Sequence, residues 1–219
     1  MPRRRACPHA DPDPLHAVKS VRRRADRKLL DRAAWLHAAG EAVAEGGFAN
    51  LRILDLAKRL GVTRGSFYWH FEDHPDLVRA FIDHWLDYRR ERTALWSRLV
   101  TERDPEAALL HSLAINFDEG RVSRRAIRIE LAVREFAARD AYAANALAIS
   151  DEMRHARNVE IYTELTGDAA RARLLALTSY LIIAGSDLLL QGPQRDEATI
   201  RGIRDLVGDV LVRRQKRSA

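Results

Sequence analysis

The sequence predicts an all-α fold, with a small N-terminal helix-turn-helix unit followed by a larger helical body. Two observations favour it. From about residue 29 onward, apolar residues recur at helical spacing between glycine and proline breaks. No stretch alternates β-branched and polar residues between hairpin turns, as a strand would. The chain has 219 residues, of which 47% are hydrophobic, so it can bury a sizeable core.

The expected helices follow one another with clear breaks. Gly46 and Gly47 favour the end of the first helix, and Gly61 that of the second. Asp73 is a good N-cap for the fourth, with Pro75 in its first turn, where the missing N–H costs nothing. The expected ranges are 29–45, 53–60, 64–70, 74–100, 105–118, 123–137, 140–165, 169–191 and 195–214.

Composition divides the chain into three parts: residues 1–26, 27–76 and 77–219. The first part has four of the seven prolines and no apolar period, which predicts a disordered arm. Residues 1–28 hold nine Lys/Arg and three Asp, so they carry the whole formal charge of +6. A basic arm on a neutral body suits binding to phosphates, whereas the alternative is an inert tail.

A helix-turn-helix is predicted between Leu56 and Phe71. Gly61 lies where the chain must reverse with a positive φ, and Val62 is expected to plug the corner. Thr63 is expected to cap the second helix of the pair, whose Phe67 and Phe71 face the core. The side of that helix turned away from the core then carries Arg64, Gly65, Ser66, Tyr68, Trp69 and His70.

Residues 29–80 resemble the TetR/AcrR family of repressors. The resemblance rests on Gly47-Phe48, on Leu56-Ala57 and on the run GVTRGSFYWHF from Gly61 to Phe71. It continues with Asp76-Leu77 in the fourth helix. A run of this length with these residues is far more specific than a generic helix-turn-helix pattern.

The resemblance implies roles in DNA binding for individual residues. Thr63, Tyr68 and His70 would bond phosphates. Base edges would be contacted by Arg64, Gly65, Ser66 and Trp69, with Arg64 the best candidate for a bidentate contact to guanine. A structural alternative stays open for three of these residues. Trp69 could pack on the first helix, and Tyr68 and His70 could form a hydrogen-bonded pair within the fold.

Two positions depart from the family pattern. Where the family often has Thr at the start of the second helix, this chain has Leu51-Arg52, so Arg52 bonds phosphate directly or Asn50 serves as the cap. Where the family commonly has Lys at the start of the fourth helix, this chain has His74. Residues 29–76 hold five basic and seven acidic residues, so the basic arm is expected to contribute more of the affinity for DNA.

For the body, the resemblance implies dimerisation through the last two helices and a small-molecule pocket. For every residue concerned, ordinary core or surface packing is the alternative. The expected dimerisation residues are Leu177, Leu181, Leu188, Val207, Val210 and Leu211. The expected ligand-binding residues are Trp85, Phe117, Glu130, Phe136, Tyr142 and Tyr162.

These features predict a cytoplasmic homodimeric repressor, bound to a palindromic double-stranded operator and released by a small hydrophobic or amphipathic ligand. The alternative is a DNA-binding scaffold whose body docks a protein partner. An enzyme is not expected, since no catalytic set, phosphate loop or cofactor motif is visible. The single Cys7 excludes an internal disulfide, and the lone Glu152-x-x-His155 pair is too little for a metal site. No apolar run reaches the roughly 18 residues of a membrane span.

Overall fold

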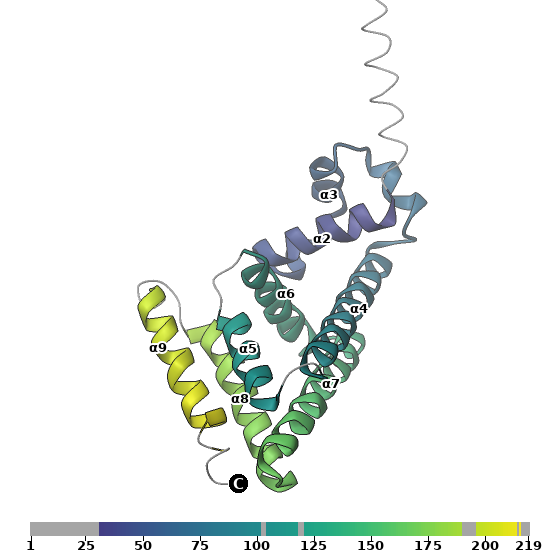
Figure 1. Ribbon diagram of the computed structural model, residues 1–219. Helices are drawn as coiled ribbons and strands as arrows, with labels where there is room; N and C mark the ends of the chain where they lie inside the picture. Colours follow the sequence, from purple (N-terminus) through teal and green to yellow (C-terminus); the bar gives the residue numbers. More distant parts are fainter. Residues whose placement is uncertain (1–30, 102–103, 118–120, 190–195, 214, 216–219) are drawn as a thin grey trace, which may run out of the picture.

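The computed structural model describes residues 31–101, 104–117, 121–189, 196–213 and 215. Within these residues the fold is entirely helical, which confirms the predicted class (Figure 1). The predicted basic arm, residues 1–26, lies outside them. The elements are α2 (Arg32–Gly46), η1 (Phe48–Asn50), α3 (Ile53–Arg59), η2 (Arg64–Trp69), α4 (His74–Thr101), α5 (Pro105–Phe117), α6 (Arg121–Ala137), α7 (Ala141–Thr166), α8 (Ala169–Leu189), α9 (Glu197–Gly208) and η4 (Asp209–Arg213).

Helices α2 and α3 form a small head at one end of the long helix α4 (Figure 1). Helix α4 runs from this head into the body, where it packs against α7. Helix α7 also packs against α6 and α8, while α5 contacts α7, α8 and α9. The head rests on α6 as well as on α4, because α2 contacts both.

The helix ends follow the capping residues that the sequence predicts. Gly47 closes α2 with a φ of 70° and donates its N–H to Val43. Asp73 accepts from the N–H of Asp76 at 2.7 Å, and the carboxylate of Asp76 accepts in return from the N–H of Glu72 at 3.0 Å. This reciprocal pair satisfies N–H groups that have no partner inside α4.

The core of the head is continuous with that of the body. Trp35 and Phe67 are fully buried and meet edge to face, with ring centroids 5.5 Å apart. The same apolar cluster extends through Leu77 and Trp85 of α4 to Val133 of α6. The boundary expected between residues 76 and 77 therefore falls inside α4 and within one core cluster.

A second core cluster holds the far end of the body. It joins α5, α7, α8 and α9 around Phe117, Ile161 and Tyr162. Val207 and Leu211, on one face of α9 and the π-helical turn η4 that continues it, are buried in this cluster. The last helix was expected to run to residue 214, but the α-helical hydrogen bonding ends at Gly208 and Asp209–Arg213 is wound more loosely.

Candidate functional site

The turn of the helix-turn-helix is built on Gly61. Its φ is 67°, the left-handed region that glycine adopts without a steric cost. The N–H of Gly61 donates to Lys58 and the N–H of Val62 donates to Ala57, which is the Schellman arrangement. Val62 is half-buried against the core of the head, as expected for the residue at the corner.

The second helix of the pair is a 3₁₀ helix, η2, and not the α-helix expected over residues 64–70. Only six residues separate two tight turns, and such short pieces commonly close with i→i+3 bonds. Thr63 occupies the N-cap position, but its side chain makes no capping hydrogen bond. Its hydroxyl is therefore not committed to η2.

η2 presents aromatic side chains to solvent from a firmly anchored backbone. Phe67 and Phe71 are buried, as the sequence predicts, and their rings stack with centroids 5.2 Å apart. Trp69 is 86% exposed, so it does not pack on α2. Tyr68 is half exposed, and its ring lies edge to face against Phe67 at 5.2 Å.

Arg64 and Tyr68 contact each other on the exposed side of η2. The Nη2 of Arg64 donates to the Tyr68 hydroxyl at 3.0 Å, and the guanidinium lies 5.8 Å from the centroid of the Tyr68 ring. Tyr68 is thus paired with Arg64, whereas the alternative from sequence paired it with His70. The bond gives the guanidinium one orientation before any ligand arrives.

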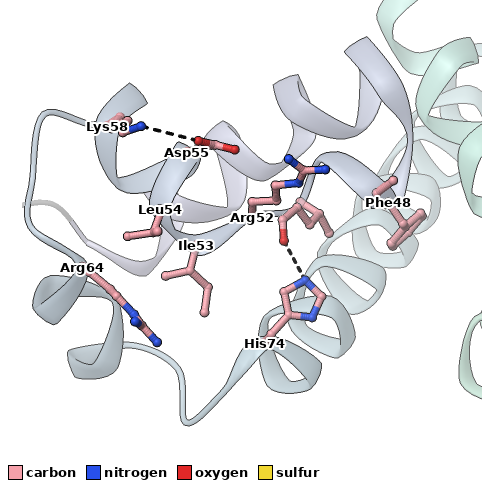
Figure 2. Close-up of a pocket in the computed structure, with 10 residues that line it drawn as sticks. Phe48, Arg52, Ile53, Leu54, Asp55, Lys58, Arg64 and His74 are labelled. Carbon is pink, nitrogen blue, oxygen red and sulfur yellow. Dashed lines mark hydrogen bonds and ion pairs between the residues drawn. The ribbon is translucent and has the colours of Figure 1, made fainter.

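An open groove of about 700 Å³ runs between η1, the start of α3 and η2 (Figure 2). Figure 2 shows Arg64 on one side of it, His74 on the other and Ile53 between them. The groove is lined by Phe48, Ala49, Leu51, Arg52, Ile53, Leu54, Asp55, Lys58, Arg64 and His74. Lys58 and the half-exposed Leu54 of α3 are members that the sequence did not single out.

His74 ties the start of α4 to the groove. Its Nε2 lies 2.6 Å from the carbonyl oxygen of Leu51, which can only accept, so Nε2 carries the proton (Figure 2). Nδ1 is the ring nitrogen left for an outside partner, and it can donate to a phosphate only when it also carries a proton. Asn50 does not serve as the cap of α3: Arg52 stands at the N-cap position, and no side-chain capping bond is formed there.

Part of the acidic charge of the head is neutralised internally. Arg59 of α3 binds both carboxylate oxygens of Glu45 at the end of α2, at 2.9 and 2.5 Å. The hydrogen bond from Arg59 lowers the pKa of Glu45, although both groups are exposed. Lys58 similarly lies 4.0 Å from Asp55. Of the basic residues of α3 and η2, Arg64 has no carboxylate partner among the described contacts.

The structure does not bring the six expected ligand-binding residues together. Trp85 and Phe136 pack in the first core cluster, where Phe136 stacks on Phe48 at 4.2 Å. Phe117 and Tyr162 lie in the second, and burial raises the pKa of Tyr162 to about 12. Tyr142 is exposed and donates to Asp83 at 2.5 Å.

Glu130, the sixth, is the centre of a charged cluster that the sequence did not single out, here called the arginine cluster. Its carboxylate lies 2.9 Å from Arg134, 3.0 Å from Arg154 and 3.4 Å from Arg89. The members are Arg89 (α4), Glu130 and Arg134 (α6), Asp151 and Arg154 (α7), and Tyr180 (α8). The spacings Glu130–Arg134 and Asp151–Arg154 were the available sequence signal, since such pairs share a helix face.

The pKa values in the arginine cluster reflect burial and mutual contact. Burial raises the pKa of Glu130, but Arg154, Arg89 and Arg134 outweigh it and hold that pKa below its ordinary value. Burial, followed by repulsion from Arg154, lowers the pKa of Arg89. The pKa of Arg134 is raised, because hydrogen bonds to Asp151 and Glu130 exceed the effect of burial.

Apolar side chains stand exposed on the last two helices. On α8 these are Leu174, Leu177 and Leu181, spaced three and four residues apart and 47–69% exposed. On α9 and η4 they are Leu206 and Val210. Of the expected dimerisation residues, Leu177, Leu181 and Val210 are therefore available at the surface.

Two other expected dimerisation residues are not available there. Val207 and Leu211 are buried within the chain, one position round the helix from Leu206 and Val210. They pack in the second core cluster, whereas the adjacent Leu206 is exposed. The side chain of Leu188 lies outside the described part of the structure.

None of the helices in the described residues is long and apolar enough to cross a membrane. The same residues contain no group of three or more His, Cys, Asp or Glu side chains placed to hold a metal ion.

Residues 36–81 match the family model described as bacterial regulatory proteins, tetR family. Over 109 residues, the chain is 34% identical to the probable HTH-type transcriptional regulator ArpR of Pseudomonas putida. It is equally similar to the HTH-type transcriptional regulator TtgR, also of Pseudomonas putida. Each match covers 50% of this chain and 51% of the relative, so the chain spans about half the length of the curated relatives it matches.

The whole fold resembles solved structures of bacterial regulators. A transcriptional regulator of Rhodococcus sp. Rha1 aligns with a TM-score of 0.68 and 19% identity, covering 84% of this chain and 96% of that one. A putative transcriptional regulator of Saccharomonospora viridis, solved in complex with choline, aligns with a TM-score of 0.68 and 17% identity. That alignment covers 82% of this chain and 94% of the other.

Proposed function

We propose that this chain is a DNA-binding transcriptional repressor, because residues 36–81 match the model of the tetR family of bacterial regulatory proteins. Its head docks in the major groove of double-stranded DNA, and two copies bind a palindromic operator. A small hydrophobic or amphipathic molecule in the body releases it. The relatives it matches are named transcriptional regulators, and an enzymatic activity is not part of the proposal.

The exposed side of η2 carries this proposal. Trp69, Tyr68 and Arg64 project from a short helix whose other side is buried through Phe67. A helix of this kind presents its side chains to base edges when it enters a major groove. Arg64 suits a bidentate contact to guanine, while Gly65, Ser66 and Trp69 complete the base-contacting surface.

Phosphate contacts are assigned around this surface. Thr63 has an uncommitted hydroxyl, and Tyr68 and His70 lie on η2 or directly after it. Arg52 and His74 line the groove beside it. The head, residues 27–76, would then act as the DNA-binding domain, and residues 77–219 as the ligand-binding and dimerisation domain.

Dimerisation is assigned to the exposed apolar side chains of α8 and α9. Leu174, Leu177, Leu181, Leu206 and Val210 expose more apolar surface than a helix pair facing water needs. Two helices from each copy would bury it in a four-helix arrangement. The two η2 helices would then lie about 34–36 Å apart, one turn of DNA.

Selection of DNA from a random pool by the purified protein tests the proposal. We expect an enriched palindrome with half-sites about one helical turn apart. Arg64→Ala should select a pool with one degenerate position in each half-site. The matched control is Arg90→Ala, an exposed arginine of α4 that pairs with Asp87 outside the head. Recovery of unenriched DNA would reject the proposal.

A further inference from the structure

The arginine cluster holds more positive than negative charge. Arg89, Arg134 and Arg154 face two carboxylates, Glu130 and Asp151, which leaves one positive charge in excess. Their side chains are only 15–31% exposed. Charge removed from water in this way is unfavourable unless a counter-charge reaches it. The excess therefore favours an anion as the partner of this cluster.

Two of the three arginines have hydrogen-bonding capacity left over. Arg89 contacts Glu130 at 3.4 Å and the Ser150 hydroxyl at 3.3 Å, both long for bonds from a guanidinium. The Nε of Arg154 is buried and has no hydrogen-bond partner among the described residues. Arg134, by contrast, binds both oxygens of Asp151 at 2.8 and 3.0 Å.

The one aromatic ring in the cluster is already occupied by cations. The Arg154 guanidinium lies 4.6 Å from the centroid of the Tyr180 ring, and that of Arg134 lies 5.7 Å from it. The Tyr180 hydroxyl donates to Asp151 at 2.9 Å. A cationic ligand would meet the like charges of these arginines here, so the cluster favours an anion.

We infer that the arginine cluster is an anion-binding site, in which Arg89 and Arg154 hold the carboxylate of a small organic acid. A carboxylate matches the planar guanidinium and neutralises the excess charge. That this acid is also the molecule that releases DNA rests on the proposed function. The connection is physical: Arg89 lies on α4, which is separated from the end of η2 by four residues and packs against α2.

Thermal unfolding with defined probes tests the site. The probes are straight-chain carboxylates from formate to dodecanoate and benzoate, each beside its uncharged amide, together with choline. We expect the acids to raise the melting temperature of the native protein, and the amides and choline to leave it unchanged. If no acid raises it, or if each amide matches its acid, the inference is overturned.

Arg89→Met separates this site from general binding of acids. The variant loses the excess charge and keeps an unbranched apolar chain in place of the arginine stem, so it should melt at or above the temperature of the native protein and no longer respond to the acids. Arg90→Met, one residue along α4, should respond as the native protein does. Equal responses in both variants would place the acid elsewhere and reject the site.

Measurement of DNA binding keeps the two proposals apart. If the native protein binds no DNA sequence selectively, the proposed function fails, while the thermal response still reports on the anion site. If it binds an operator and the acids lower its affinity at least tenfold, only with Arg89 present, the cluster is the effector site. Stabilisation by acids without release of the operator would keep the anion site and reject its role as effector.

Discussion

The Nη2 of Arg64 donates a hydrogen bond to the hydroxyl of Tyr68, 3.0 Å away and four residues further along η2. Tyr68 is itself held edge to face against the buried Phe67. The position of the Arg64 guanidinium is therefore linked to the core of the head through Tyr68.

This bond changes what Tyr68→Phe is expected to do. A role for Tyr68 only at phosphate predicts equal weakening on all sequences, whereas the bond predicts that Tyr68→Phe relaxes the same base position as Arg64→Ala. Arg64→Ala should cost about 1–3 kcal/mol of binding free energy. In a double-mutant cycle measured by fluorescence anisotropy, the two changes should couple by about 0.5 kcal/mol or more. Additive effects would contradict the link.

Two glycines of the helix-turn-helix should separate stability from DNA binding. Gly61→Ala places a side chain at a φ of 67°, which should lower the free energy of unfolding by about 1–2 kcal/mol. At Gly65 an added Cβ would meet only Thr63 Oγ1, at an ordinary 3.7 Å. Gly65→Ala should therefore unfold in urea like the native protein within about 0.5 kcal/mol, yet bind DNA more weakly. The assignments would be wrong if Gly65→Ala lowered the free energy of unfolding and Gly61→Ala did not.

A charge on the exposed face of α8 should prevent dimerisation. Leu181 is 62% exposed, so Leu181→Glu is tolerated in the folded monomer but unfavourable in a buried apolar interface. We expect a dimer of the native protein at micromolar concentration and a monomer of the variant in analytical ultracentrifugation. Leu95→Glu, at a similarly exposed leucine of α4, is the control and should remain dimeric. A monomeric native protein at that concentration rejects the assignment.

Deletion of residues 1–26 tests the basic arm. It removes seven Lys/Arg and three Asp next to a head that holds more acidic than basic residues. Each lost phosphate contact should flatten the slope of log K against log salt by about 0.9, with base preference largely retained. Replacement of Arg22, Arg23 and Arg24 by Gln should act more strongly than the same change at residues 3–5, because the former are closer to the head along the sequence. Unchanged affinity and slope would favour the inert tail.

Removal of a carboxylate from the arginine cluster should lower the free energy of unfolding far more than removal of an exposed carboxylate. Glu130→Gln leaves three half-buried arginines facing Asp151 alone, so the free energy of unfolding should fall by up to about 3 kcal/mol at neutral pH. Glu135→Gln is the control, since Glu135 is exposed on the same helix and pairs with Arg139. Urea unfolding of the three proteins measures the difference. Equal stability of the two variants would mean that the cluster contributes little.

The same carboxylate predicts how stability depends on pH. The pKa of Glu130 is lower in the folded chain than its ordinary value of 4.5, so its contribution is fully present above that value and is lost as the pH falls through the lower folded pKa. Urea unfolding from pH 7 down to pH 3 should show a steeper loss for the native protein than for Glu130→Gln. Parallel curves would show that Glu130 is not held ionised by the cluster.

The sequence by itself determined the features that depend on local interactions. Gly47, Gly61 and Asp73 end or begin helices where expected, because capping needs only a few neighbouring residues. The burial of Phe67 and Phe71 also followed from their spacing. The Gly61–Phe71 run was specific enough for the family resemblance that the family model bears out.

Only the tertiary structure decided which face of each helix of the body is buried. Val207 and Leu206 are adjacent apolar residues, yet one is buried and the other exposed, because the packing of α9 on α5 sets its rotation. The arginine cluster likewise joins residues up to 91 positions apart, from Arg89 to Tyr180, whose approach no local pattern encodes. Helical periodicity gives the apolar faces of a helix, but the neighbouring helices determine which of those faces is covered.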